Sequence, residues 1–194
     1  MDIKILVLPP IGTNCCIISS CGKCAVIDPA SCADMISDEI KKSALVPEYI
    51  LLTHGHFDHI GGADELKVRF PDAKLMISGE DAAMLADPVM NASALFLGNG
   101  IFCRSAYETV SDGDIITLGN ENISVMATPG HTKGSLCYDC ADCVFTGDTV
   151  FADGYGRTDL PNAAPEKLLS SVNKVKEKCR GKTAYPGHGD KFII

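Results

Sequence analysis

The segment of the chain with the most metal-ligating side chains is LLTHGHFDHIGG, residues 51–62. Within six positions it holds three histidines and one aspartate: His54, His56, Asp58 and His59. His54 and His56 are two residues apart at the end of an extended segment, so their side chains can point the same way. Neutral imidazoles and carboxylates are ligands for zinc, iron or manganese. Because these four groups exceed what one tetrahedral ion needs from one loop, the pattern favours a pair of metal ions.

Three further segments supply groups of the same kind. His131 lies in TPGHTKGS, Asp148 in FTGDTVF and His188 in YPGHGD. Each follows a predicted strand and stands near a glycine, in the kind of loop that usually carries functional groups. A single histidine in such a place is usually part of an ordinary turn. All five histidines of the chain, however, are expected at strand ends, with none in a helix interior. This arrangement predicts one metal centre assembled from several loops.

The segments between these loops alternate between strand-like and helix-like patterns. In the first half, short apolar runs predict strands over 3–8, 14–19, 24–28, 47–53 and 73–78. Helices are predicted over 33–42, 63–70 and 79–87. The second half predicts strands over 114–119 and 123–130, a hairpin over 134–148, a helix from Pro165, and a last strand over 183–187. Strands followed by helices, twice over, predict an α/β fold of two sheets with helices outside them.

The composition excludes several classes of protein. The net charge is −8 and no Lys/Arg cluster is present to neutralise phosphates, so we expect no nucleic-acid partner. The apolar runs are too short to span a membrane, and the N-terminus MDIKILVLPP is typical of a first strand, not of a signal peptide. We therefore expect a cytoplasmic protein that acts on a small molecule, without a membrane partner.

Ten cysteines are many for a chain of 194 residues. Without a secretion signal we expect reduced thiols, several of them serving as small core residues. An alternative rests on two predicted hairpins that carry CxxC spacings, Cys21 with Cys24 and Cys140 with Cys143. If the two turns meet in space, they would form a second metal site or a redox centre.

The four polar motifs THGHFDHIGG, TPGHTKGS, FTGDTVF and YPGHGD, in this order, resemble the metal signature of the metallo-β-lactamase fold superfamily. The resemblance covers nearly the whole chain and implies a single domain over 1–194 with a four-layer αββα sandwich. It implies that His54, His56 and His131 bind one metal ion and that Asp58, His59 and His188 bind a second. Asp148 would bridge the two ions. Two divalent ions are expected, with Zn²⁺ first and Fe or Mn as alternatives.

Within the superfamily the chain is most similar to the glyoxalase II group. Its segment GDTVFADGYGRTDLP resembles the stretch after the bridging aspartate in that group, where a basic residue, here Arg157, contacts a thioester substrate. Typical members continue into a helical C-terminal domain that binds glutathione, whereas only DKFII follows His188-Gly189. The resemblance therefore implies thioester hydrolysis more firmly than it implies glutathione as the thiol carrier.

The expected reaction is attack by a metal-bridging hydroxide on an acyl thioester. Asp58 is also a candidate to orient that hydroxide, and Arg157 to pair with a substrate carboxylate. Because a thiolate leaves without protonation, no separate general acid is needed. A persulfide dioxygenase remains an alternative, with a single iron on His54, His131 and Asp148.

Residues 88–107 show no clear periodicity and are expected to form a loop or short helix over the site. Four apolar side chains in this segment either line a substrate wall or fill the core: Met90, Leu95, Phe96 and Phe102.

Overall fold

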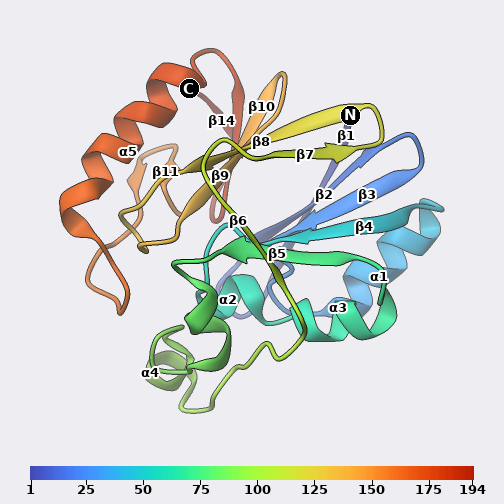
Figure 1. Ribbon diagram of the computed structural model, residues 1–194, viewed down its shortest axis with the longest axis horizontal. Coiled ribbons are helices and arrows are strands. Elements are labelled where there is room, and N and C mark those ends of the chain that lie inside the picture. The colour runs from blue at the N-terminus through green and yellow to red at the C-terminus, as the bar shows by residue number, and fades with distance from the viewer.

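Two six-stranded sheets pack face to face in the computed structural model, which describes residues 1–194 (Figure 1). The first sheet has the order β1-β2-β3-β4-β5-β6. Its strands are β1 (Asp2–Leu8), β2 (Thr13–Ser20), β3 (Lys23–Ile27), β4 (Val46–Leu51), β5 (Lys74–Ser78) and β6 (Glu108–Val110). β1, β2 and β3 pair antiparallel, whereas β3, β4, β5 and β6 run parallel. The parallel strands therefore deliver their C-terminal ends to the same edge of the sheet.

The second sheet has the order β14-β13-β10-β9-β8-β7. Its strands are β7 (Ile115–Leu118), β8 (Glu121–Ala127), β9 (Leu136–Asp139), β10 (Cys143–Gly147), β13 (Thr183–Pro186) and β14 (Phe192–Ile193). β10 and β13 are parallel neighbours, so the loops that follow them also lie at one edge. A separate two-stranded ribbon follows β10 and consists of β11 (Val150–Phe151) and β12 (Gly154–Tyr155).

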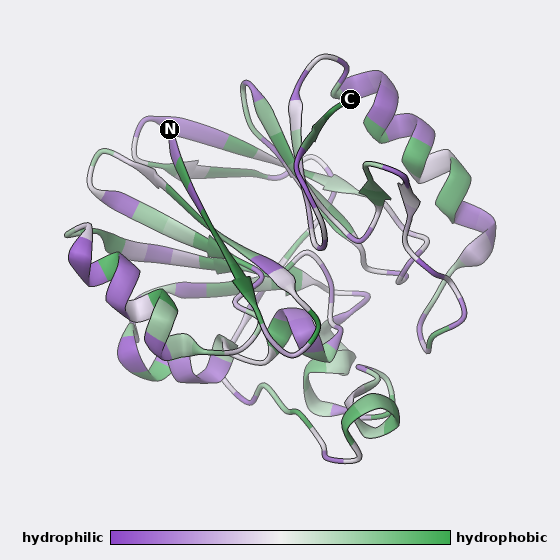
Figure 2. Cartoon of the chain, turned by 180° about the vertical axis from the view of Figure 1, so that it is seen from behind, coloured by the Kyte–Doolittle hydropathy of each residue, from purple (hydrophilic) through white to green (hydrophobic).

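Helices cover the outer face of each sheet. The helices on these faces are α1 (Ala33–Lys42), α3 (Ala63–Arg69) and α5 (Pro165–Lys178). Three shorter helices occur in connecting segments: α2 (Phe57–Ile60), the 3₁₀ helix η1 (Ala82–Ala86) and α4 (Ser93–Leu97). α1 and α3 bury Ile36, Ile40 and Leu66 against the first sheet. α5 buries Leu168 and Val175 against the second sheet, and its other face is hydrophilic (Figure 2). None of the helices is both long and apolar enough to cross a membrane.

A third apolar layer lies between the two sheets. It joins residues of the first sheet, such as Ile18 and Ile27, to residues of the second, such as Val125 and Phe145. The buried hydroxyl of Tyr138, in β9, donates a 2.8 Å hydrogen bond to the Leu52 carbonyl just after β4. The layers are therefore helix, sheet, sheet, helix, which confirms the predicted α/β fold with an αββα sandwich.

Most predicted elements are present with shifts of one to three residues at their ends. Strands β4 and β8 end at Leu51 and Ala127, before the predicted limits, because the chain turns there into the histidine loops. The segment predicted as a helix over 79–87 forms only the 3₁₀ helix η1. α2 also corrects one expectation, because His59 lies inside this one-turn helix instead of in a loop.

The junction between α2 and α3 consists of two glycines, Gly61 after α2 and Gly62 before α3. A Cβ on Gly61 would lie 2.5 Å from the Ala30 carbonyl oxygen, and a Cβ on Gly62 would lie 2.9 Å from the Pro29 carbonyl oxygen. The Ala30 amide also donates a 3.0 Å hydrogen bond to the His59 carbonyl. The backbone therefore approaches closely at these glycines, and this contact fixes α2 against the loop after β3.

Candidate metal centre and active-site pocket

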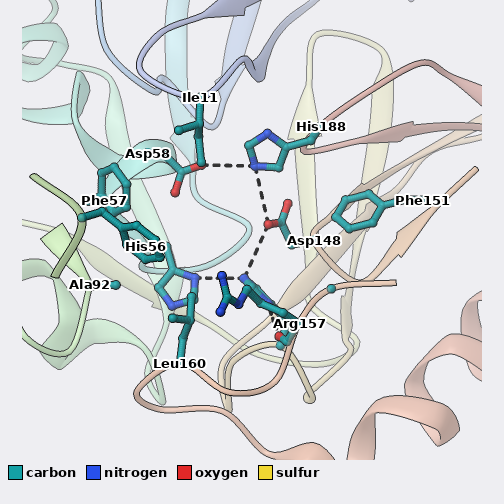
Figure 3. Close-up of a pocket in the computed structure, with 13 residues that line it drawn as sticks. Ile11, His56, Phe57, Asp58, Ala92, Asp148, Phe151, Arg157, Leu160 and His188 are labelled. Carbon is teal, nitrogen blue, oxygen red and sulfur yellow. Dashed lines mark hydrogen bonds and ion pairs between the residues drawn. The ribbon is translucent and has the colours of Figure 1, made fainter. Parts of the chain in front are cut away.

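All seven residues proposed as ligands lie in the loops after β4, β8, β10 and β13, or in α2. Figure 3 labels four of them, His56, Asp58, Asp148 and His188. Three groups of three have ligand atoms within 4.8 Å of one another: His54, His56 and His131; His54, His59 and Asp148; and Asp58, His59 and His188. The first and third groups are the two sets that the resemblance implies. Asp148 lies between them, with its Oδ2 3.5 Å from His131 Nε2 and 3.6 Å from His188 Nε2.

Unpaired polar atoms mark the same place. Four buried side-chain N or O atoms have no hydrogen-bond partner: His54 Nε2, His56 Nε2, His59 Nε2 and Asp148 Oδ1. Buried polar atoms without a partner are rare because each costs free energy. Three of these residues, His54, His59 and Asp148, form one of the groups whose ligand atoms lie together. A divalent cation among them would supply the missing partner, so the donor set fits a metal centre.

Electrostatics place His54, His56 and Asp58 in ligand-competent forms, whereas the neighbouring carboxylates raise the pKa of His59 and His188 against the lowering effect of burial. Burial lowers the pKa of His54 well below its ordinary value and, together with nearby His131, lowers the pKa of His56 to about 3. Both imidazoles are therefore neutral at physiological pH, as a metal ligand requires. Burial alone would raise the pKa of Asp58, but His59 and hydrogen bonding to His188 hold it below its usual range. The Asp58 carboxylate is thus ionised, the form proposed for orienting a hydroxide.

Asp28 orients His59 from behind. Its Oδ2 lies 2.8 Å from His59 Nδ1, which leaves Nε2 facing Asp58 and Asp148. The same carboxylate accepts hydrogen bonds from the backbone amide and the hydroxyl of Thr53, at 2.8 and 2.7 Å. A carboxylate behind a histidine fixes the ring orientation and raises its basicity. Asp28 therefore connects the end of β3 to the histidine loop.

Asp81 holds the loops around His54, His56 and His131 from another direction. This residue is 0% exposed and accepts hydrogen bonds from the Gly55 and Gly134 amides, at 3.1 and 2.8 Å. It also accepts 2.7 Å hydrogen bonds from the Thr132 hydroxyl and the Asn162 amide group. One buried side chain thus joins three loops. The sequence reasoning missed both Asp28 and Asp81, although each stands at or just beyond a strand end, the position that located the ligands.

Gly187 allows the residues around the Asp58, His59 and His188 group to pack closely together. A Cβ on Gly187 would collide with Asp148 Oδ1 and would lie 2.7 Å from His59 Cε1. On the other side, Thr13 donates a 2.8 Å hydrogen bond to Asp58 Oδ2, which lies 3.2 Å from His188 Nε2. The Asp58, His59 and His188 group is therefore packed directly against backbone and a fixed hydroxyl.

The ligand residues form the floor of a cavity of about 400 Å³. Its walls are mainly apolar: Ile11, Phe57, Ala92, Phe96, Phe151 and Leu160 (Figure 3). Phe96, in α4, stacks on Phe57 with ring centroids 5.8 Å apart, so the expected short helix contributes one wall residue. Met90, Leu95 and Phe102 do not line the cavity, because the segment turns them away from it. Leu95 is 69% exposed and is not a core residue either.

Arg157 lies on the cavity wall, but its guanidinium is already paired. Nε and Nη2 donate hydrogen bonds of 2.6 and 2.7 Å to the two carboxylate oxygens of Asp159. The Arg157 carbonyl lies 2.7 Å from His131 Nδ1, so the backbone of this residue helps to orient a predicted ligand. The contact of Arg157 with a substrate carboxylate stays a prediction.

The cysteine hairpins do not meet. Cys24 belongs to the apolar cluster between the first sheet and α1, whereas Cys140 and Cys143 belong to the cluster between the sheets. Cys21 is exposed at the β2–β3 turn, and no cysteine is part of any group of three ligand atoms within 4.8 Å. The alternative of a second metal site built from these four thiols is therefore not supported.

The sequence matches the metallo-beta-lactamase superfamily over residues 8–188. It is 34% identical over 167 residues to the probable metallo-hydrolase YqgX of Bacillus subtilis (strain 168), a match covering 85% of this chain and 79% of that protein. It is 31% identical over 154 residues to the hydroxyacylglutathione hydrolase of Yersinia pestis (strain Pestoides F), covering 79% of this chain and 52% of that enzyme. The chain thus aligns with about half of the latter protein.

Solved structures agree with this match. The BLEG-1 B3 metallo-beta-lactamase superimposes with a TM-score of 0.93 at 30% identity, covering 99% of this chain and 94% of that chain. TTHA1623 in a di-iron-bound form gives 0.86 at 25% identity, covering 98% and 94%. ETHE1 from Myxococcus xanthus gives 0.77 at 27% identity, covering 98% and 76%. With a family match that spans nearly all its strands and loops, the chain belongs to the metallo-beta-lactamase superfamily.

Proposed function

We propose that this protein is a binuclear metal-dependent hydrolase of small acyl thioesters, similar in reaction to glyoxalase II. Two ligand groups side by side, with an aspartate between them, support a two-ion centre, and the similarity to a hydroxyacylglutathione hydrolase supports the thioester. His54, His56 and His131 would hold one ion, Asp58, His59 and His188 the other, and Asp148 would contact both. Zinc is the first expectation, and the di-iron form of TTHA1623 supports iron as an alternative.

When bound, two divalent ions supply an activated water nucleophile and polarise the substrate carbonyl. The chain's own residues prepare the site for this chemistry. Asp28 fixes the His59 ring, and Thr13 fixes the Asp58 carboxylate, so both ligands keep one orientation. The Arg157 carbonyl does the same for His131. The apolar walls exclude bulk water and strengthen electrostatic interactions inside the cavity.

The observation that favours a thioester is the lack of a proton donor in the cavity. Its lining consists of predicted ligands, apolar residues, Gly156 and Arg157, without lysine, tyrosine, serine or threonine. An amine or alkoxide leaving group departs more readily when such a side chain supplies a proton, whereas a thiolate leaves without one. The substrate class that this lining suits best is therefore a thioester.

A second candidate is hydrolysis of a β-lactam, because the BLEG-1 B3 metallo-beta-lactamase is similar over nearly the whole chain. The persulfide dioxygenase alternative requires one iron on His54, His131 and Asp148, but the unpaired atoms of His56 and His59 favour the larger ligand set. Elemental analysis and turnover assays separate the three functions.

The test is metal content per chain, on protein purified under nitrogen without added metal, followed by parallel assays with an acyl thioester, nitrocefin and a persulfide. We expect about two metal ions per chain and thioester turnover that exceeds nitrocefin turnover. One iron with oxygen uptake on the persulfide would favour the dioxygenase. Faster nitrocefin turnover would favour the β-lactamase, and failure to bind any metal would refute the metal-centre proposal.

A further inference from the structure

We propose that Asp159 neutralises Arg157 and thereby makes the cavity selective for thioesters that are uncharged and apolar. This inference rests on the proposed thioester hydrolysis and concerns the substrate class of the same cavity.

Arg157 is the only lysine or arginine among the residues that line the cavity. Both nitrogens on one side of its guanidinium are bonded to Asp159, in the paired geometry that a substrate carboxylate would otherwise take. An anionic substrate must therefore displace Asp159, and the freed carboxylate then lies beside the incoming negative charge. The pair has no net charge, so the wall offers no attraction for an anion at longer range.

The backbone around the pair is fixed. The Arg157 carbonyl lies against His131 Nδ1, and three residues after Asp159 the Asn162 side chain is bonded to buried Asp81. Arg157 and Asp159 are two residues apart in this anchored loop, so they meet without a long-range rearrangement. Their side chains are 54% and 66% exposed, so the pair contributes little to folding stability and its effect is expected on ligand choice.

The remaining wall favours an apolar ligand. Ile11 is 59% exposed and Phe96 is 50% exposed, although each lines the cavity directly above the predicted ligands. Apolar side chains gathered around a cavity and left open to solvent are typical of a site that binds apolar groups. Phe151, beside His188, and Leu160, beside His56, add to the apolar surface (Figure 3). An alkyl or aryl chain on either side of the thioester would cover these residues.

Two non-hydrolysable ligands of matched chain length test the inference by titration calorimetry on the metal-loaded protein. S-hexyl-N-acetylcysteamine is uncharged, and S-hexylglutathione carries a net negative charge. For the unchanged protein we expect the uncharged ligand to bind about tenfold more tightly. Asp159→Asn frees the guanidinium and is expected to improve the relative affinity for S-hexylglutathione by about fivefold, the scale of an exposed ion pair.

Two variants complete the design. Asp153→Asn removes the same charge from the exposed β11–β12 turn, outside the cavity lining, and is expected to leave the ratio of the two affinities unchanged. Arg157→Gln combined with Asp159→Asn is expected to abolish the gain, because no guanidinium remains to be freed. Both the wild-type ratio and the Asp153 control can be measured even if Asp159→Asn is unstable.

The inference is overturned if the unchanged protein binds S-hexylglutathione as tightly as the uncharged ligand. It is also overturned if folded Asp159→Asn leaves the ratio where it was, or if Asp153→Asn shifts it equally. Thioester hydrolysis is assayed separately from binding. Selective binding without hydrolysis would refute the proposed function alone, whereas hydrolysis without selectivity would refute only this inference.

Discussion

The Asp81 carboxylate accepts a 2.7 Å hydrogen bond from the Thr132 hydroxyl, one residue after His131. Asp81 follows β5 in the first sheet, and Thr132 follows β8 in the second. The contact therefore joins the two halves of the sandwich beside the predicted metal centre. Because the same carboxylate accepts the amide of Gly55, between His54 and His56, it sets the positions of three predicted ligands at once.

Replacing Asp81 by asparagine puts an amide NH₂ among groups that are all donors. At least one buried donor then loses its acceptor, and we expect the free energy of unfolding to fall by about 1–3 kcal/mol. We also expect the metal content to fall from about two ions per chain toward one, because His54, His56 and His131 lose their common support. Elemental analysis and urea denaturation measure both effects. Asp72→Asn, at an exposed position before β5, is the matched control. Full occupancy in folded Asp81→Asn would contradict the supporting role.

Gly187→Ala is expected to disturb the Asp58, His59 and His188 group. The added methyl group would collide with Asp148 Oδ1 and crowd His59, so these side chains cannot keep their positions. We predict loss of about one metal ion per chain and a fall in hydrolysis of at least tenfold. Gly154→Ala is the control, because a Cβ there meets no atom within 4 Å. The packing argument fails if Gly187→Ala binds two ions as tightly as the unchanged protein.

Removal of the metal ions is expected to lower the stability of the whole sandwich. The predicted ligands come from both sheets, so bound ions link the loops after β4 to those after β8, β10 and β13. An ion present at about 100 times its dissociation constant stabilises the folded state by about 2.7 kcal/mol. Thermal unfolding with and without a chelator measures this difference, and added Zn²⁺ should reverse it. An unchanged midpoint after verified metal removal would show that the ions do not link the halves.

Cysteine reactivity should separate into two classes. Cys21 and Cys32 are exposed, whereas the other eight cysteines are buried. Burial raises the pKa of Cys24 to about 12 and that of Cys137 to about 11, which keeps these thiols protonated and unreactive. Iodoacetamide at pH 8 is therefore expected to modify Cys21 and Cys32 first, as read by peptide mass spectrometry. All ten should react in denaturant, and rapid modification of Cys24 in the folded protein would contradict this assignment.

Most strands, and the loops that carry the predicted ligands, can be located from the sequence because both leave local patterns. An apolar run followed by glycine and histidine is visible without knowing the fold, and five such histidines reinforce one another. The helix α2 escapes prediction because its four residues are too few to show a helical period. β6 and β14, of three and two residues, form because neighbouring strands are there to pair with them.

Asp28 and Asp81 show what local patterns leave out. Each is one aspartate near a turn, a common arrangement with no distinctive spacing. Its role is set by donors from other segments: His59 and Thr53 for Asp28, and Thr132 and Asn162 for Asp81. The pairing of Arg157 with Asp159 is similar, because the spacing permits it and only the loop's course brings the side chains together.

Three residues of the cavity walls lie in parts of the fold that carry no predicted ligand. Ile11 lies in the β1–β2 loop, Phe96 in α4, and Leu160 in the loop after β12. The predicted ligands lie in other loops and in α2. Their supporting carboxylates, Asp28 and Asp81, form no hydrogen bond with any of these three wall residues. Substitutions at these three positions are therefore expected to leave the predicted metal centre intact. Because these wall positions are separate from the predicted metal ligands, the substrate can change during evolution while the metal-dependent chemistry is kept. This fits a superfamily that includes both a hydroxyacylglutathione hydrolase and a B3 metallo-beta-lactamase.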